Sequence, residues 1–260
     1  TYVPLYDLVL KRILPIKRVE MRLLVDKQEK YLPQKPVSPA FHDVDELISH
    51  LKNYPYYVEE KVNGFHFIAI KSDNDVKVYT EDGKDMTKHL PTFVKEIKKL
   101  SSVNFSIDGE LFIVENGVQK GRADLIKFVT QKEIPDDKNV HAKVWDITFY
   151  KRDLKNLALR VRKQYLKKLH FTDRIKEVRT KFCETEKEVR DAINSMSKIK
   201  YSEGAVVKEA DSTYSPGKKI SAWLKYRNYL YFNLHVLKVI KNEAGNYNYL
   251  VGVKACLLYT

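Results

Sequence analysis

The chain has 260 residues, of which 43% are hydrophobic and 12% aromatic, a composition that supports a folded core and excludes a disordered or low-complexity protein. Its 47 lysines and arginines outnumber its 34 acidic residues, giving a formal charge of +13. Such a surplus indicates affinity for a polyanion, because cations bound to phosphates release condensed counterions. The alternative is a source whose proteins are generally rich in lysine.

The cysteines and the hydrophobic pattern indicate a compartment. The two cysteines, Cys183 and Cys256, form no CxxC pair or Cys/His cluster, which argues against a disulfide framework and zinc and favours a reducing intracellular location, cytoplasm or nucleus. We find no apolar run of about 18 residues and no secretory leader, so we expect no membrane partner. The missing initiator Met and the abrupt end at 257–260 predict a piece of a longer protein.

Short helices and strands alternate irregularly along the chain. An amphipathic stretch over 5–13 is followed by Pro33 and Pro36, which are typical of a linker. Asp43 and Thr185, each with a glutamate three residues later, are predicted to cap helices. In chain order we predict a helix from Asp43, strands over 56–61, 65–71 and 76–80, a helix over 91–100, a strand over 105–114 with a hairpin at Asn116-Gly117, a helix over 123–130, a strand over 140–150, helices over 160–170 and 185–196, and strands over 202–208, 222–227, 231–240 and from 247. This interleaving favours an α+β fold over a parallel-sheet one.

The hexapeptide Glu59-Glu60-Lys61-Val62-Asn63-Gly64 places a lysine at the end of a predicted strand and a glycine at the following turn. Such a lysine points into a site, and the glycine lets a ligand phosphate approach the backbone. A nucleophilic amine must be partly neutral, which burial or neighbouring cations promote. Taken alone, the hexapeptide is more often an exposed lysine beside a turn.

Further strands combine acids, cations and tryptophan. In Ser106-Ile107-Asp108-Gly109-Glu110-Leu111, alternation places two carboxylates on one strand face, as a divalent metal or ribose hydroxyls require; a solvent-facing strand is the alternative. The segment 202–208 sets Glu203 before a glycine and ends in Lys208. The segment 223–227 puts Lys225 and Arg227 on one face, either as a phosphate clamp or as a basic strand edge. Trp145 offers a plane for stacking on a base, or a core side chain.

Together and in this order, these motifs resemble those of the ATP-dependent DNA ligase family. They are Lys61-x-x-Gly64, Asp108-Gly109-Glu110, Trp145-Asp146, Glu203-Gly204-x-x-x-Lys208 and Trp223-Leu224-Lys225-x-Arg227, with the string 211–219 before the last. The resemblance, which covers roughly Pro36 to Leu230, implies an α+β nucleotidyltransferase fold, an ATP-grasp-like adenylation domain of antiparallel sheets and flanking helices. It places this domain at 37–229, the beginning of an OB-fold β-barrel at 230–260, and a linker or the tail of an upstream helical DNA-binding domain at 1–36.

The resemblance also implies the chemistry. Lys61 would attack the α-phosphate of ATP and form lysyl-AMP; AMP would pass to the 5′-phosphate of nicked double-stranded DNA, and the 3′-hydroxyl would seal the strand. Magnesium is the expected ion, and the protein is expected to act as a monomer, recruited by an unspecified protein. The implied nucleotide-binding residues are Glu59, Glu60 and His66, with Trp145 stacking on adenine, Glu110 and Glu203 on the ribose or the metal, and Lys208, Lys225 and Arg227 on the α-phosphate.

Three positions depart from the family pattern. Asn63 stands where Asp is usual, and its neutral amide could ease deprotonation of Lys61. His66 and Glu81 stand where Arg is usual, so a forked phosphate contact and a cation are lost. Two alternatives therefore stay open: an RNA ligase or capping-type enzyme, and a degenerate member that binds nucleic acid without catalysis. Because the barrel is incomplete, we also expect this chain to bind ATP but to adenylate itself poorly.

Overall fold

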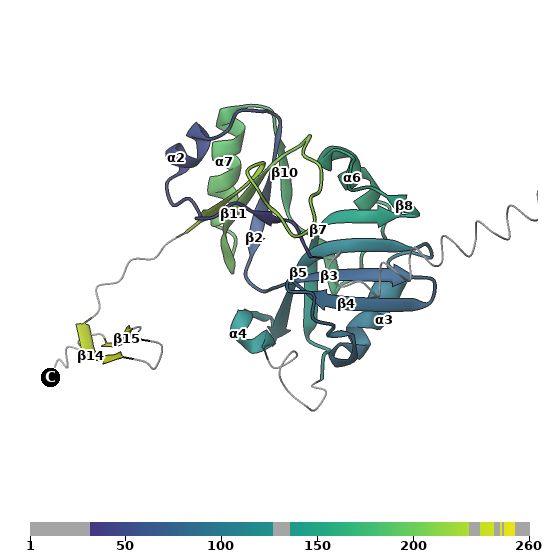
Figure 1. Cartoon of the computed structure of the whole chain (residues 1–260), viewed down its shortest axis with the longest axis horizontal. Coiled ribbons are helices and arrows are strands. Elements are labelled where there is room, and N and C mark those ends of the chain that lie inside the picture. Colours follow the sequence, from purple (N-terminus) through teal and green to yellow (C-terminus); the bar gives the residue numbers. More distant parts are fainter. Residues whose placement is uncertain (1–31, 127–135, 229–234, 242–244, 246, 253–260) are drawn as a thin grey trace, which may run out of the picture. The chain divides into compact units, whose positions relative to one another are not determined.

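The computed structural model describes residues 32–126, 136–228, 235–241, 245 and 247–252. The chain divides into two compact units, Thr1–Arg227 and Asn228–Thr260 (Figure 1). No helix within the described ranges is long and apolar enough to cross a membrane. The amphipathic stretch predicted over 5–13 lies outside the described residues, as does the second half of the helix predicted over 123–130.

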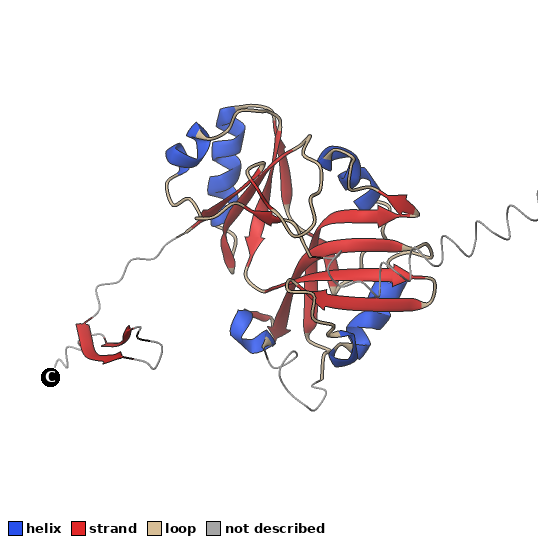
Figure 2. Cartoon of the chain, viewed as in Figure 1, coloured by secondary structure: helices blue, strands red, loops and turns tan. Residues whose placement is uncertain are grey.

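Seven strands form the larger sheet, seen as the broad red layer in Figure 2. The main path runs β4-β3-β5-β7-β8, with β6 paired to β5 and β9 paired to β7. The strands are β3 (Phe65–Ser72), β4 (Asp75–Thr80), β5 (Phe105–Glu115), β6 (Val118–Lys120), β7 (Val140–Tyr150), β8 (Arg152–Asp153) and β9 (Ile175–Glu177). All of these pairs are antiparallel except β7–β9.

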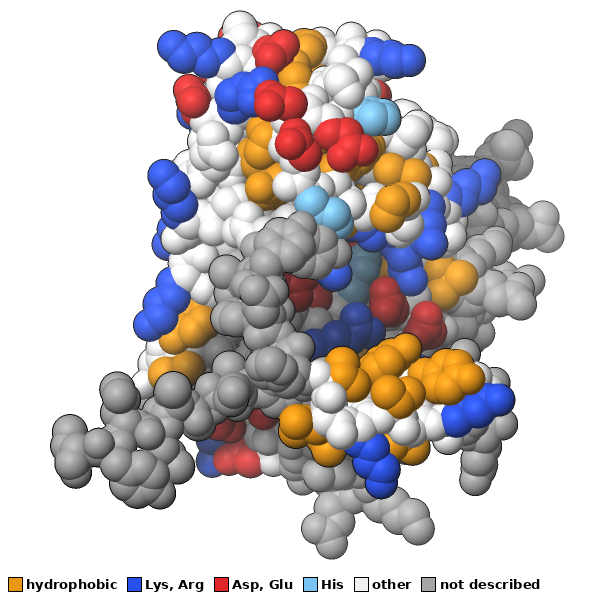
Figure 3. Space-filling view, turned by 90° about the vertical axis from the view of Figure 1, so that its left-hand side faces the viewer, with side chains coloured by type: hydrophobic (Ala, Val, Ile, Leu, Met, Phe, Trp, Pro, Cys, Tyr) orange, Lys and Arg blue, Asp and Glu red, His pale blue; other side chains and the backbone are white. Residues whose placement is uncertain are grey.

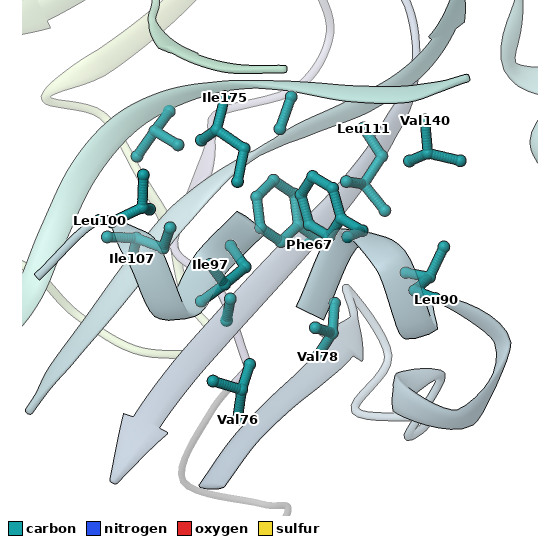
Figure 4. Packing of buried hydrophobic residues seen from close by; sticks show 14 of the residues in the cluster. Phe67, Val76, Val78, Leu90, Ile97, Leu100, Ile107, Leu111, Val140 and Ile175 are labelled. Atoms are coloured by element: carbon teal, nitrogen blue, oxygen red, sulfur yellow. The ribbon is translucent and has the colours of Figure 1, made fainter. Parts of the chain in front are cut away.

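One face of the larger sheet is filled by the main hydrophobic core. The helix α3 (Pro91–Lys99) begins with Pro91 in its first turn and buries Phe93 and Ile97 against the sheet. Phe67 meets Phe93 edge to face at a centroid distance of 5.8 Å, and Figure 4 shows Phe67 among the packed side chains. Since strand side chains alternate between faces, burial of Phe67 leaves its neighbour His66 on the opposite face. The core therefore fixes which face is open to chemistry.

A second sheet has the order β10-β2-β11-β13 and is antiparallel throughout. Its strands are β2 (Tyr56–Val62), β10 (Thr180–Cys183), β11 (Ser202–Glu209) and β13 (Trp223–Arg227). Two helices, α2 (Val44–Ser49) and α7 (Glu186–Ser197), pack against it around a separate core. Thr185 caps α7 in a complete capping box with Glu188, as predicted, and the Asp43 side chain caps α2. The short parallel pair β1 (Lys35–Pro36) and β12 (Lys219–Ile220) completes this half.

The two sheets are joined at the predicted glycine turn and by one helix. Strand β2 passes directly into β3 through Asn63 and Gly64, where a Cβ on Gly64 would lie 2.0 Å from the Leu111 carbonyl oxygen, so only glycine fits. The helix α6 (Leu159–Leu166) links the sheets with two adjacent side chains. Arg162 forms a two-pronged ion pair with Asp146 on β7, at 2.8 and 2.9 Å, and Lys163 pairs with Glu59 on β2.

The predicted α+β class is confirmed, and most predicted strands exist close to their predicted bounds. The hairpin at Asn116-Gly117 is confirmed, with both residues at positive φ, 52° and 75°. The helix predicted over 160–170 ends earlier, at Leu166, and the one predicted over 123–130 is described only as α4 (Arg122–Leu125). The short strands β1, β8, β9, β10 and β12 were not predicted, because two to four residues carry too little periodicity.

The second unit contains one antiparallel hairpin, β14 (His235–Lys241) and β15 (Tyr247–Gly252). This is the strand–turn–strand pattern predicted across Gly245, whose φ of +82° suits the turn. Its apolar side chains, including Leu237 at 66% exposure and Tyr249 at 60%, are largely uncovered. Figure 3 shows apolar side chains gathered on this unit beside lysines. The domain boundaries at 36 and 229–230 remain predictions.

Candidate active site

Lys61 lies at the end of β2, where it meets Glu203 of the neighbouring strand β11. Its ammonium donates a hydrogen bond to Glu203 Oε2, and Arg227 Nη2 lies 3.4 Å from the same oxygen. The β2–β11 register shifts between Ser202 and Ala205, a bulge that re-aims the intervening side chain. Glycine is needed beside it, since Gly204 has φ +134° and an added Cβ would lie 2.2 Å from a backbone oxygen. The bulge and Gly204 together turn the Glu203 carboxylate toward Lys61.

The predicted cation pair on β13 flanks this contact. Arg227 is half exposed beside Glu203, and Lys225 donates to Ser38 Oγ at 3.0 Å. Burial lowers the pKa of Lys225, and the positive charges of Arg227 and Lys61 lower it further. Lys61, Lys225 and Arg227 are therefore close enough to repel one another. Cations gathered in this way bind a phosphate group that neutralises them.

His66 and Asp108 form the centre of the site on the larger sheet. His66 Nε2 lies 2.5 Å from Asp108 Oδ1, and the Tyr214 hydroxyl donates to Asp108 Oδ2 at 2.6 Å. Burial alone would lower the pKa of His66, but the carboxylates of Asp108, Glu110 and Glu81 together outweigh it and the pKa is raised. Burial and the same carboxylate raise the pKa of Tyr214 well above its ordinary value. His66 is thus fixed by a buried network rather than left as a free substitute for arginine.

Glu110 lies opposite His66 on the paired strands β3 and β5. Burial raises the pKa of its carboxyl to about 7; His66 and Lys61 act to lower it, and Glu203 acts to raise it. Glu110 and Glu203 therefore belong to one electrostatic neighbourhood although they come from different sheets. The described residues contain no group of three or more His, Cys, Asp or Glu side chains arranged to hold a metal ion.

Glu59 lies between two lysines in what we call the buried triad, Lys163–Glu59–Lys208. Lys208 Nζ lies 2.6 Å from Glu59 Oε2, and Lys163 pairs with Oε1, an atom that has no well-directed hydrogen bond. The Lys208 ammonium also lies 3.9 Å from the centre of the Trp223 ring and 5.2 Å from that of Trp145. Burial lowers the pKa of Lys208, while Glu59 acts to raise it. Sequence reasoning missed Lys163, which carries no motif signal.

The remaining predicted residues lie in two places. Trp145 meets His66 with ring centroids 4.9 Å apart, and its indole Nε1 has no hydrogen-bond partner. Glu60 is turned away from Lys61 and binds Lys143 Nζ through both oxygens, at 2.6 and 2.7 Å. The structure thus brings together every predicted site residue except Glu60 around Lys61, His66 and the buried triad. An open hollow of about 790 Å³ beside Phe171 and Arg174 contains none of them.

A lysine amine lies among carboxylates and other cations where residues of the two sheets meet, a combination that is typical of sites for phosphoryl or nucleotidyl transfer. The family model described as ATP dependent DNA ligase domain matches residues 36–227. The chain therefore belongs to the ATP-dependent DNA ligase domain family.

Relatives and solved structures agree with this assignment. DNA ligase 4 of Gallus gallus is 28% identical over 210 residues, covering 74% of this chain and 22% of the relative, and the DNA ligase of Methanococcus aeolicus is 26% identical over 178 residues, covering 65% and 31%. The chain thus spans less than a third of the length of these two relatives. For the fold, a mycobacterial DNA ligase D complexed with ATP and MES aligns with TM-score 0.61 (17% identical, 87% of this chain and 69% of that one), and the bacteriophage T7 ligase with 0.53 (16%, 86% and 81%). The predicted nucleotidyltransferase fold is confirmed.

Proposed function

We propose that this chain is the catalytic core of an ATP-dependent DNA ligase in which Lys61 is the nucleophile. Its ammonium first gives up a proton to solvent; the neutral amine nitrogen then forms a bond to the α-phosphorus of ATP, the bond to pyrophosphate breaks, and the nitrogen loses a second proton. AMP then passes to the 5′-phosphate at a nick in double-stranded DNA, and the 3′-hydroxyl displaces AMP and seals the strand. The observation that carries this proposal is that Lys61 shares the Glu203 carboxylate with Arg227, a cation of β13.

Charge around Lys61 supports attack on a phosphate. Lys225 and Arg227 lie on β13, which pairs with the strand β11 that carries Glu203, and supply positive charge where negative charge develops during transfer. Lys208 is already paired with Glu59 and is almost fully buried, so it acts on the phosphate through its charge rather than by direct contact. Of the three predicted phosphate ligands, Lys225 and Arg227 are therefore the direct ones.

The donor set fits a magnesium ion. Magnesium in phosphoryl-transfer sites is held by one or two carboxylates together with phosphate oxygens and water, rather than by an all-protein cage. Glu110 and Glu203 are two carboxylates close enough to influence each other, and the described residues contain no larger ligand group. When bound, the ion would neutralise phosphate charge. Glu110 and Glu203 would hold it or the ribose.

The base is expected beside Trp145. The indole has an exposed part and packs against His66, and a base stacked on it would contact both rings. Glu59 would lie behind the base, and its side chain already pairs with two lysines, so backbone groups of β2 are better placed to read adenine. Glu60, bound to Lys143, would support the strand rather than touch the nucleotide.

Covalent labelling with ATP carrying a radioactive α-phosphate tests the proposal. Wild type and Lys77→Ala, a matched change of an exposed lysine paired with Asp85, should both retain label after denaturation. Lys61→Ala should retain none. The label should be lost in acid, as expected of a phosphorus–nitrogen bond. Incubation runs to a plateau, so that slow labelling is not mistaken for absence of labelling. Equal labelling of Lys61→Ala and wild type would contradict the assignment.

A parallel experiment addresses the polynucleotide. Nicked duplexes with a 5′-phosphate, one all DNA and one all RNA, are offered to the labelled protein. Transfer of AMP to the DNA nick supports a DNA ligase. Preferential transfer of AMP to the RNA nick would instead indicate an RNA ligase. A chain that binds nicked DNA and never carries label would be a binding module.

A further inference from the structure

Glu81 follows β4 and forms, with Lys35 and Arg122, what we call the rim triad. Lys35 Nζ lies 3.1 Å from Glu81 Oε2, and Arg122 Nη2 lies 3.2 Å from Glu81 Oε1. The three residues come from three segments: β1, the end of β4 and the start of α4. The resulting charge is +1, the same as one arginine. Glu81 therefore does not leave this place negative; it gathers two cations there.

The geometry leaves Arg122 prepared for a further ligand. Its side chain is 58% exposed, yet its guanidinium is held by Glu81 and lies 5.2 Å from the centre of the Phe65 ring. A guanidinium has five N–H donors, and the contact to Glu81 uses one edge. Exposed ion pairs contribute little to stability. A surface arginine that is both ordered and accessible binds an oxyanion with less loss of side-chain entropy.

The rim triad adjoins the site around Lys61. The field of Arg122 reaches Glu110, and that of His66 reaches Glu81. On the other side, Lys35 is the strand partner of Lys219, whose charge also acts on Lys225. Cations therefore extend from Lys61 through β13, β12 and β1 to Arg122, with the carboxylates of Glu203 and Glu81 among them. Such a row matches a ligand that carries repeated negative charges.

We propose that Arg122 and Lys35, positioned by Glu81, bind a phosphodiester group of the nucleic-acid strand on which Lys61 acts. This inference rests on the proposed function for its substrate, but the binding step is separate from adenylation. The ligand is a strand phosphate rather than the triphosphate tail of ATP, because the exposed guanidinium faces solvent at the edge of the site.

The test measures binding of a nicked duplex with a 5′-phosphate to the 260-residue chain, by fluorescence anisotropy across a salt series. Arg122→Ala is compared with Arg190→Ala, which removes the same charge from a partly exposed arginine that is likewise ion-paired, in its case with Asp45 and Glu186. Lys35→Ala is compared with Lys77→Ala. We expect Arg122→Ala to weaken binding about threefold to tenfold and to make the salt slope shallower by about one ion. The control variants should stay within about twofold of wild type, as expected of a charge that contacts no phosphate.

Different failures have different meanings. If Arg122→Ala and Arg190→Ala bind the duplex equally, the inference is wrong, even when wild type forms Lys61-AMP. If Arg122→Ala raises the ATP concentration needed for labelling and leaves duplex affinity at the control value, the ligand is the nucleotide and the inference is also wrong. If wild type never carries label while Arg122→Ala still loses affinity relative to its control, phosphate binding stands and the proposed function fails.

Discussion

The buried triad and the rim triad have the same composition, one glutamate between two cations, and differ in burial. In Lys163–Glu59–Lys208 the side chains are 4%, 2% and 3% exposed. In Lys35–Glu81–Arg122 they are 32%, 22% and 58% exposed. Each carries a formal charge of +1 and each joins separate segments of the chain. The main difference between them is contact with water, beside the arginine that replaces one lysine in the rim triad.

Burial determines what each triad can do. Charges removed from water depend on one another, because loss of one partner leaves an uncompensated charge in a poorly polarisable interior. The buried triad therefore fixes structure: it ties α6 to β2 two residues before Lys61. Charges in water cost little free energy to separate, so Lys35 and Arg122 can exchange part of their contact with Glu81 for contact with a phosphate. One glutamate between two cations thus supports the structure in the buried triad and, by our proposal, binds a phosphate in the rim triad.

The largest difference in stability between the two triads is expected when the central glutamate is neutralised. Glu59→Gln removes the ion-pair partner of Lys208 and leaves Lys163 with only the more distant Glu177, at 3.9 Å, and should lower the free energy of unfolding by about 3–5 kcal/mol. The matched change Glu81→Gln should lower it by less than about 1 kcal/mol. Urea denaturation of both variants measures the difference.

Salt provides the control for this comparison. The effect of Glu59→Gln should be nearly the same at low salt and at about 1 M NaCl, since buried pairs are poorly screened, whereas that of Glu81→Gln should shrink. Equal losses of stability in the two variants would show that burial does not distinguish the triads.

A smaller effect is expected when the whole buried triad is made apolar. The variant Lys163→Met, Glu59→Leu, Lys208→Met leaves no unpaired charge, so it should recover at least about 2 kcal/mol of the stability lost in Glu59→Gln. Its labelling by ATP should nevertheless stay low, because the cations behind the phosphate are gone. Thermal denaturation and the labelling assay report the two properties separately. A triple variant less stable than Glu59→Gln would mean that packing around Trp145 and Trp223, and not charge, dominates there.

The two triads also show which contacts can be predicted from the sequence and which cannot. Lys61, Glu203 and the cations of β13 were predictable, because strand alternation and a glycine at each turn place side chains from short segments. Lys163 was not, since it lies on a helix whose pattern concerns packing. The pairing of Glu81 with Lys35 and Arg122 joins residues 41 or more positions apart, and no local pattern encodes such contacts. Glu81 replaces the cation that is usual at this position, and only the folded structure shows that Lys35 and Arg122 bring positive charge back to it.

The rim triad should affect how the stability of the protein falls as the pH becomes acidic. Burial acts to raise the pKa of Glu81, but hydrogen bonds and charge from Lys35 and Arg122 outweigh it, so the folded-state pKa is lowered. A carboxyl with a lowered folded pKa contributes stability above its unfolded value of 4.5, and this contribution disappears as the pH falls through the folded pKa. Wild type should therefore exceed Glu81→Gln in stability by a few tenths of a kcal/mol, up to about 1 kcal/mol, at about pH 6, and the two should converge near about pH 3. Urea titrations at both pH values measure this gap. A gap that widens toward low pH would mean that the two cations do not hold Glu81 in its charged form.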